Sequence, residues 1–120
     1  MGRKVLFVED TEDWRSVVSH SLTGAGFEVV LAKDASEAMQ QTEGVELGLI
    51  ILDLNLAGES GISLMRFLRR NFPLVPVLLY TGIEHDDGTI KAMLKDGADA
   101  YLHKGGMEEL LNVVRATFKG

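Results

Sequence analysis

The chain has 120 residues, of which 46% are hydrophobic and 25% are charged. This length and composition indicate one folded domain over residues 1–120 with its own hydrophobic core, and they exclude an intrinsically disordered protein. The absence of cysteine excludes disulfides, thiolate metal sites and cysteine nucleophiles, and the net charge of −6 argues against direct binding of nucleic acid.

Apolar stretches in the chain are short. The longest, Leu47–Leu52, is far shorter than a membrane-spanning helix, and the first ten residues turn acidic too early for a signal peptide. We therefore expect a cytoplasmic protein that has no membrane partner.

Five short apolar runs predict β-strands, and segments with helical periodicity separate them. The runs are Val5–Val8, Val29–Leu31, Leu47–Leu52, Val75–Tyr80 and Ala100–Leu102. Strands that alternate with helices indicate a parallel sheet with helices on both faces. The third run lacks polar alternation, as expected for a central strand that is buried on both sides. Five such units fit an open, doubly wound α/β sheet and are too few for an eight-stranded barrel.

The first two helices are predicted after the first and second strands. Trp14, Val18 and Leu22 are spaced four apart and share one helix face. Asp34 and Glu37 form a capping-box pattern that opens the second helix. The side chains expected to face inward from that helix are Ala35, Ala38 and Met39.

Three further helices follow the third, fourth and fifth strands. Ser60 is a candidate N-cap for the third helix, and a segment near Asp87 to Lys95 predicts the fourth, with Gly97 as its C-terminal stop. The buried stripes expected on the three helices are Leu64, Phe67 and Leu68; Ile90, Met93 and Leu94; and Met107, Leu110, Leu111, Val114 and Phe118.

Polar residues stand where four of the predicted strands end. Glu9 and Asp10 follow the first strand, Asp53 the third, Thr81 the fourth and Lys104 the fifth. The carboxyl ends of parallel strands lie at one edge of the sheet, so we expect these groups to meet there, with Asp53 open to solvent and within reach of Lys104. Two like charges about 4 Å apart repel by about 4 kcal/mol at an effective dielectric of about 20, so three carboxylates require a cation. Mg²⁺ suits a site with few protein ligands.

Carboxylates, a metal ion, a lysine and a hydroxyl together suit the handling of a phosphoryl group. The sequence has no phosphate-binding glycine motif and no hydrolase nucleophile elbow, so the phosphoryl group must come from another molecule. Each residue also has a simpler explanation. Asp53 could cap a turn, Glu9 and Asp10 could begin a helix, and Thr81 is a common strand residue. Their combination at the strand ends favours phosphoryl chemistry.

Four segments of the chain resemble the receiver domains of bacterial two-component response regulators. They are VLFVEDTEDWR, LGLIILDLNLAGESGISLMRFLR, VPVLLYTG and GADAYLHK, spread over residues 5–104. The resemblance implies a flavodoxin-like sheet of strand order 2-1-3-4-5 with five helices. It also implies a signalling protein rather than an enzyme with a separate substrate.

The resemblance implies a role for each polar residue in a phosphorelay. Asp53 would accept a phosphoryl group from the phosphohistidine of a sensor histidine kinase or phosphotransfer protein. Asp10 would bind Mg²⁺ directly, Glu9 would assist through water, and Asn55 would offer its backbone carbonyl.

A second group of residues would bind the phosphoryl group and transmit the change. Lys104 would contact the phosphoryl oxygens, Thr81 would move toward them, and Tyr101 would turn inward. The change would alter the surface of the fourth helix, fifth strand and fifth helix, which would contact a downstream protein or a fused output domain.

Three positions depart from the usual receiver pattern: Gly105, Ala57 and Gly82. Gly105 stands where a proline commonly follows the lysine, so we predict a trans Lys104–Gly105 peptide bond, because a cis bond before a non-proline residue costs about 2.5–4 kcal/mol. Ile83 lies two residues beyond Thr81, and with Asn55 it should give moderate rather than very fast loss of phosphate.

Other functions remain to be distinguished. The main alternative is a degenerate receiver that acts as a protein-interaction module without phosphorylation. A haloacid-dehalogenase phosphatase would need Asp-x-Asp at the end of its first strand, whereas here Asp53 leads to Asn55. A flavodoxin would need a Ser/Thr/Gly-rich loop after its first strand, whereas this chain has Glu-Asp-Thr-Glu-Asp. Whether the chain is a stand-alone receiver or the first part of a larger regulator stays open.

Overall fold

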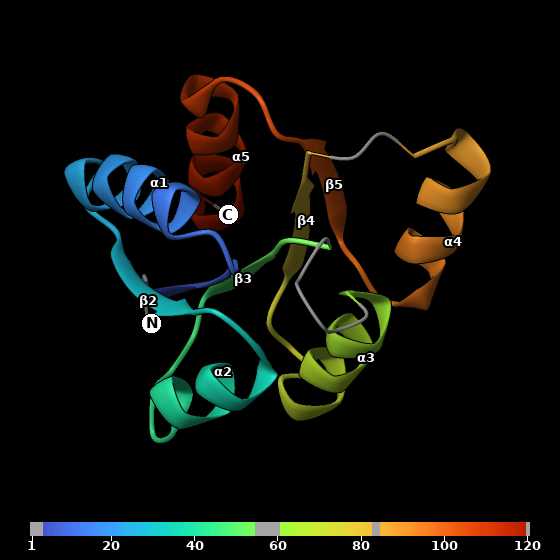
Figure 1. Ribbon diagram of the computed structural model, residues 1–120, viewed down its shortest axis with the longest axis horizontal. Coiled ribbons are helices and arrows are strands. Elements are labelled where there is room, and N and C mark those ends of the chain that lie inside the picture. The colour runs from blue at the N-terminus through green and yellow to red at the C-terminus, as the bar shows by residue number, and fades with distance from the viewer. Residues whose placement is uncertain (1–3, 55–60, 83–84, 120) are drawn as a thin grey trace.

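Five parallel strands form one sheet in the order β2-β1-β3-β4-β5 in the computed structural model, which describes residues 4–54, 61–82 and 85–119 (Figure 1). Helices alternate with the strands along the chain, as the sequence predicts. The strands are β1 Lys4–Val8, β2 Glu28–Ala32, β3 Leu49–Leu52, β4 Val77–Thr81 and β5 Ala100–His103. The helices are α1 Glu12–Gly24, α2 Ala35–Thr42, α3 Gly61–Asn71, α4 Asp87–Asp96 and α5 Met107–Lys119.

The sheet separates two hydrophobic cores, one under each layer of helices. Helices α1 and α5 cover one face, while α2, α3 and α4 cover the other (Figure 1). Strand β3 contributes alternately to both cores: Leu49 and Ile51 face α1 and α5, and Ile50 and Leu52 face the opposite layer. Burial on both sides explains why this strand is apolar throughout, because a parallel central strand has no solvent-facing side.

The helix ends are stabilised by capping residues that the sequence predicts. The Asp34 carboxylate accepts a hydrogen bond from the backbone N–H of Glu37 at 2.8 Å and so caps α2. The Glu37 side chain returns a bond to the backbone N–H of Lys33 at 3.1 Å, one residue earlier than in an ideal capping box. Gly97 ends α4 with φ +134°, a conformation that favours glycine. The predicted cap Ser60 lies outside the described residues.

Two of the predicted buried stripes are partly wrong. Phe67 is 37% exposed and Leu94 is 38% exposed. In α3 the buried stripe is centred on Leu68, with Leu64 and Met65 beside it, so Phe67 falls at the stripe's edge. In α4 only Met93 is fully buried. Apolar spacing alone does not specify which side of an apolar stripe meets the sheet, because the helix can rotate about its axis.

Arg69, in the last turn of α3, joins that helix to the start of β5. Its guanidinium donates to the carbonyl of Gly97 at 2.7 Å, to the carbonyl of Val75 at 2.7 Å and to the carboxylate of Asp99 at 2.5 Å. The same carboxylate accepts the backbone N–H of Val77 at 2.8 Å. This network fixes the amino ends of β4 and β5, at the edge of the sheet opposite the polar residues.

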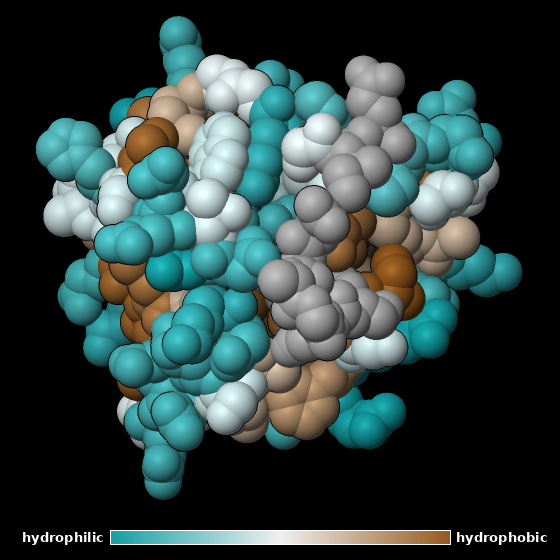
Figure 2. All heavy atoms as spheres, viewed as in Figure 1, coloured by the Kyte–Doolittle hydropathy of each residue, from teal (hydrophilic) through white to brown (hydrophobic). Residues whose placement is uncertain are grey.

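Hydrophilic side chains cover most of the face shown in Figure 2, and strongly hydrophobic residues show only in separate patches. None of the helices formed by the described residues has the length and apolar character needed to cross a bilayer.

Candidate functional site

The sheet register brings the predicted polar residues together at the carboxyl edge. The backbone N–H of Asp53 donates to the carbonyl of Val8 at 3.0 Å, directly beyond the paired residues Val8 and Leu52. The backbone N–H of Lys104 likewise donates to the carbonyl of Thr81 at 2.7 Å. These bonds extend the parallel pairing one residue past the strands. The site residues that follow β3 and β5 are therefore positioned by the sheet itself.

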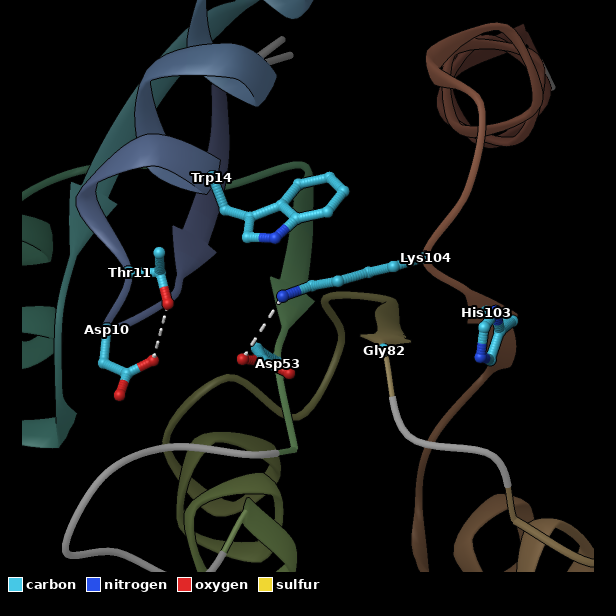
Figure 3. Close-up of a pocket in the computed structure, with 7 residues that line it drawn as sticks. All are labelled: Asp10, Thr11, Trp14, Asp53, Gly82, His103 and Lys104. Carbon is cyan, nitrogen blue, oxygen red and sulfur yellow. Dashed lines mark hydrogen bonds and ion pairs between the residues drawn. The ribbon is translucent and has the colours of Figure 1, made fainter.

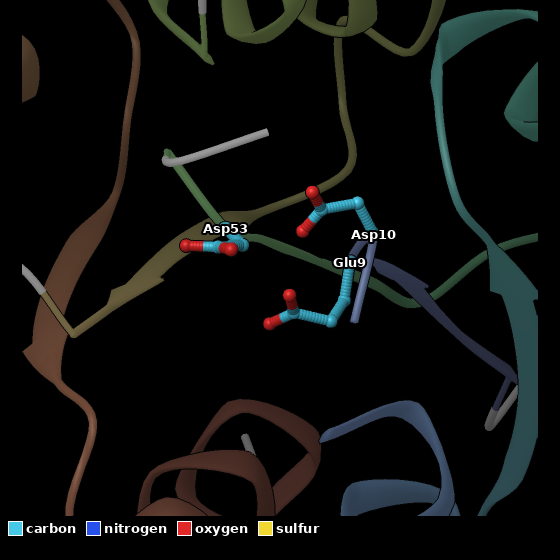
Figure 4. Close-up of side chains that lie close together, drawn as sticks. All are labelled: Glu9, Asp10 and Asp53. Carbon is cyan, nitrogen blue, oxygen red and sulfur yellow. The ribbon is translucent and has the colours of Figure 1, made fainter. Parts of the chain in front are cut away.

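Three carboxylates converge at this edge (Figure 4). Carboxylate oxygens of Glu9, Asp10 and Asp53 all lie within 4.8 Å of one another. Glu9 is completely buried, Asp53 is 2% exposed, and Asp10 is half-buried. The backbone N–H of Thr11 donates to Glu9 Oε2 at 3.2 Å, and Arg15 Nη1 donates to the Glu9 carbonyl at 2.7 Å. These contacts hold the Glu9 side chain and backbone at the end of β1.

Lys104 provides a positive charge inside this cluster. Its Nζ lies 2.5 Å from Glu9 Oε1 and 3.5 Å from Asp53 Oδ2. The pKa of the Glu9 carboxyl is nevertheless raised from 4.5 to about 7, because burial, aided by the neighbouring Asp53, outweighs the opposing effect of Lys104. Glu9 is therefore a carboxylate whose charge is poorly compensated by the protein alone.

A cavity of about 480 Å³ opens beside Asp53 and Lys104 (Figure 3). Its walls come from the start of α1 and from the ends of β3, β4 and β5. The sequence predicts that Asp53 is open to solvent, but this residue is 2% exposed and contributes to the cavity wall instead. Neighbouring backbone and side chains cover it because it directly follows a fully buried strand. The lining residues are Asp10, Thr11, Trp14, Asp53, Gly82, His103 and Lys104.

The two residues expected to act as a switch lie on β4 and β5. Thr81 is fully buried at the end of β4. Tyr101 is half-buried on β5, and its ring meets the ring of His85 edge-on, with 6.1 Å between the centroids. Both rings line a second cavity of about 210 Å³. Thr81 therefore belongs to the carboxyl edge, whereas Tyr101 contacts the second cavity on the α4 side.

Not every predicted site residue can be placed. Asn55 and Ile83 lie outside the described residues, so their predicted roles remain untested. The peptide bond between Lys104 and Gly105 is trans, as predicted, and no peptide bond within the described ranges is cis.

The donor set fits a hard divalent cation. Three carboxylates supply oxygen ligands within a small volume, and two of them, Asp10 and Asp53, border the cavity. Oxygen donors of this kind suit Mg²⁺, which binds through one or two carboxylates and retains several waters. The raised pKa of Glu9 is a further physical reason for the fit, because a nearby cation favours the ionised form of a buried carboxyl.

Trp14 is one of the cavity-lining residues that the sequence did not assign to the site, together with Thr11 and His103. The helical spacing of Trp14 indicates packing at the core or its rim, but the indole lies in the cavity wall, with Lys104 Nζ 4.7 Å from the ring centroid. Its position four residues after Asp10 was the only available signal, and that signal does not distinguish a packed indole from one over the lysine.

Similarity to known proteins shows to which family the chain belongs. The sequence model of the response regulator receiver domain matches residues 5–115. The chain belongs to this family. Its sheet order and helices are those of the family's fold. A solved receiver-like structure, the chemotaxis protein CheY4 of Vibrio cholerae, superposes with a TM-score of 0.89 at 29% identity, covering 98% of this chain and 100% of that one.

Curated relatives of this receiver domain are longer proteins. The uncharacterized transcriptional regulatory protein YrkP of Bacillus subtilis is 37% identical over 93% of this chain and 47% of its own length. The phosphate regulon transcriptional regulatory protein PhoB of Escherichia coli is 32% identical over 99% of this chain and 53% of its length. The chain thus spans about half the length of these two relatives.

Proposed function

We propose that this protein is a phospho-accepting receiver in which Asp53 takes a phosphoryl group from a histidine kinase or phosphotransfer protein in the cytoplasm. The observation that carries the proposal is the convergence of Glu9, Asp10 and Asp53 beside the ammonium of Lys104, at the edge of a cavity. The whole chain, residues 1–120, forms the receiver domain in this proposal.

The chemistry assigned to Asp53 is an in-line displacement at phosphorus. One carboxylate oxygen forms a bond to phosphorus as the bond from phosphorus to the donor's imidazole nitrogen breaks, and the electron pair remains with that nitrogen. Hydrolysis later returns the carboxylate and releases inorganic phosphate. Lys104 Nζ, already 3.5 Å from Asp53 Oδ2, is placed to donate to a phosphoryl oxygen.

Mg²⁺ supplies charge neutralisation of the phosphoryl oxygens when it is bound. Among the described residues, Asp10 and Asp53 would hold it directly and Glu9 would assist through water, while Asn55 would add its backbone carbonyl. The excess negative charge of Glu9, Asp10 and Asp53 attracts the cation, and Lys104 keeps the cluster from being fully anionic without it.

The output we propose is a change at the surface of α4, β5 and α5. A phosphoryl group adds about −1.5 to −2 charges. Thr81 would form a hydrogen bond to it, and Tyr101 would turn inward. A downstream protein or a fused output domain would bind the altered surface. Asn55 and Ile83 would tune the rate of phosphate loss.

The test is intact mass spectrometry of the whole chain after incubation with acetyl phosphate and Mg²⁺. Wild type should gain one phosphoryl group, Asp53→Asn should gain none, and chelation of Mg²⁺ should abolish the reaction. Asp13→Asn is the matched control, because Asp13 is an exposed acid of α1 outside the carboxylate cluster. Unmodified wild type would contradict the proposal and favour the degenerate, phosphorylation-independent module.

A further inference from the structure

The indole of Trp14 covers the ammonium group of Lys104 (Figure 3). Lys104 reaches from the end of β5 across the cavity, and its Nζ lies 4.7 Å from the indole centroid. A cation at this distance over an indole face is attracted by the ring quadrupole, and the attraction increases when the cation is removed from water. The Lys104 side chain is only 9% exposed, so the contact is largely desolvated.

The Trp14 indole is held in place by Tyr80. Its ring meets the ring of Tyr80 edge-on, with 6.0 Å between centroids and an interplanar angle of 87°. Tyr80 is completely buried on β4, directly before Thr81. Edge-to-face aromatic pairs of this kind are favourable and fix ring orientation. Trp14 thus belongs to a rigid support, not to a freely rotating surface of α1.

The ammonium of Lys104 has contacts of two kinds, and they differ in how they respond to a cation. Its ion pairs with Glu9 and Asp53 depend on the charges of those carboxylates, which a bound cation would share. The contact with Trp14 depends only on the indole. The lysine stem has four carbons about which it can rotate, so the position of the ammonium depends on the contacts that hold it.

We propose that Trp14 is a positioning residue that keeps the Lys104 ammonium over Asp53 when the carboxylates are engaged by a cation. This inference rests on the proposed phosphoryl transfer to Asp53. Trp14 itself touches neither the phosphoryl group nor the metal. It acts through Lys104, which would otherwise be free to move toward solvent through the cavity mouth.

A direct measurement of the contact uses the NMR shifts of the Lys104 side chain. Protons above the face of an aromatic ring are shifted upfield, so the Lys104 ε-methylene protons should show this shift in wild type and lose it in Trp14→Leu. The shift should persist when Mg²⁺ and beryllofluoride are added. Its disappearance under those conditions would overturn the proposal, whatever the phosphorylation rates are.

A kinetic measurement tests whether Trp14 acts through the lysine. With acetyl phosphate as donor, Trp14→Leu should lower the rate of Asp53 phosphorylation about three- to tenfold, and Trp14→Phe should recover part of that loss. In the Lys104→Met background, Trp14→Leu should have no further effect. An equal loss in both backgrounds would mean a merely structural role and would refute positioning.

The control is Val17→Ala, on the same helix one turn further and 48% exposed, which should leave the rate within about twofold of wild type. Failure of the two proposals is distinguishable. If wild type takes up no phosphoryl group, the proposed function fails. If wild type reacts and Trp14→Leu reacts equally fast, only the positioning role fails.

Discussion

Replacing Glu9 by glutamine should stabilise the metal-free protein at pH 8. Glu9 is completely buried, and this burial is the largest of the effects that together raise the pKa of its carboxyl from 4.5 to about 7. Between pH 4.5 and 7 the folded protein keeps a proton on Glu9 that the unfolded chain has already released, so stability falls as the pH rises through this range. The loss is complete above pH 7 and absent below pH 4.5. Glutamine has nearly the same shape and never acquires the charge.

The size of the effect follows from the same pKa difference. Each pH unit between the unfolded and folded pKa values corresponds to about 1.4 kcal/mol, so the charged Glu9 destabilises the fold by about 3 kcal/mol at pH 8. This figure already includes the favourable ion pair with Lys104, 2.5 Å away, which glutamine would weaken. We expect Glu9→Gln to gain about 2–3 kcal/mol at pH 8 and to match wild type at pH 4.

Urea unfolding between pH 4 and 8, in the presence of a chelator, measures this difference. Glu46→Gln is the control, because Glu46 is exposed between α2 and β3 and should change stability by less than about 0.5 kcal/mol at every pH. Added Mg²⁺ should stabilise wild type at pH 8 more than Glu9→Gln. If Glu9→Gln is instead less stable than wild type at pH 8, the ion pair with Lys104 outweighs burial and the reasoning is wrong.

Three further substitutions test the fold outside the site by urea unfolding. Arg69→Met removes hydrogen bonds to three backbone carbonyls and one carboxylate and should destabilise by about 2–4 kcal/mol, whereas Arg70→Met, an exposed neighbour on α3, should change stability by less than about 0.5 kcal/mol. Gly97→Ala places a side chain at φ +134° and should lower the free energy of unfolding by about 1–3 kcal/mol. In the control Gly24→Ala the added side chain meets no atom within 4 Å, so stability should stay the same or rise by up to about 1 kcal/mol. Equal effects of the two substitutions would contradict the conformational argument. Asp34→Ala removes the cap of α2 and should lower the free energy of unfolding by about 1 kcal/mol. Unchanged stability would show that the cap does not stabilise the helix.

Much of the architecture was predictable because its signals are local. The apolar run at β3 predicted a central strand, and the acid pair at Glu9 and Asp10 marked the end of β1. The capping residues Asp34 and Gly97 lie within a few residues of the helix ends that they stabilise. The family then followed from the order and spacing of the motifs, which the match over residues 5–115 confirmed.

Local patterns in the chain identify the polar groups at the ends of the strands, because alternation of strands and helices favours parallel pairing. How those groups meet depends on the folded packing. Glu9 and Lys104 are 95 residues apart in the chain, and nothing near either residue encodes their contact. The burial that raises the Glu9 pKa, and the placement of Trp14 over the lysine, come from packing α1 against the sheet beside the end of β5. Such contacts depend on the whole fold, since they join side chains from elements that have no local relation.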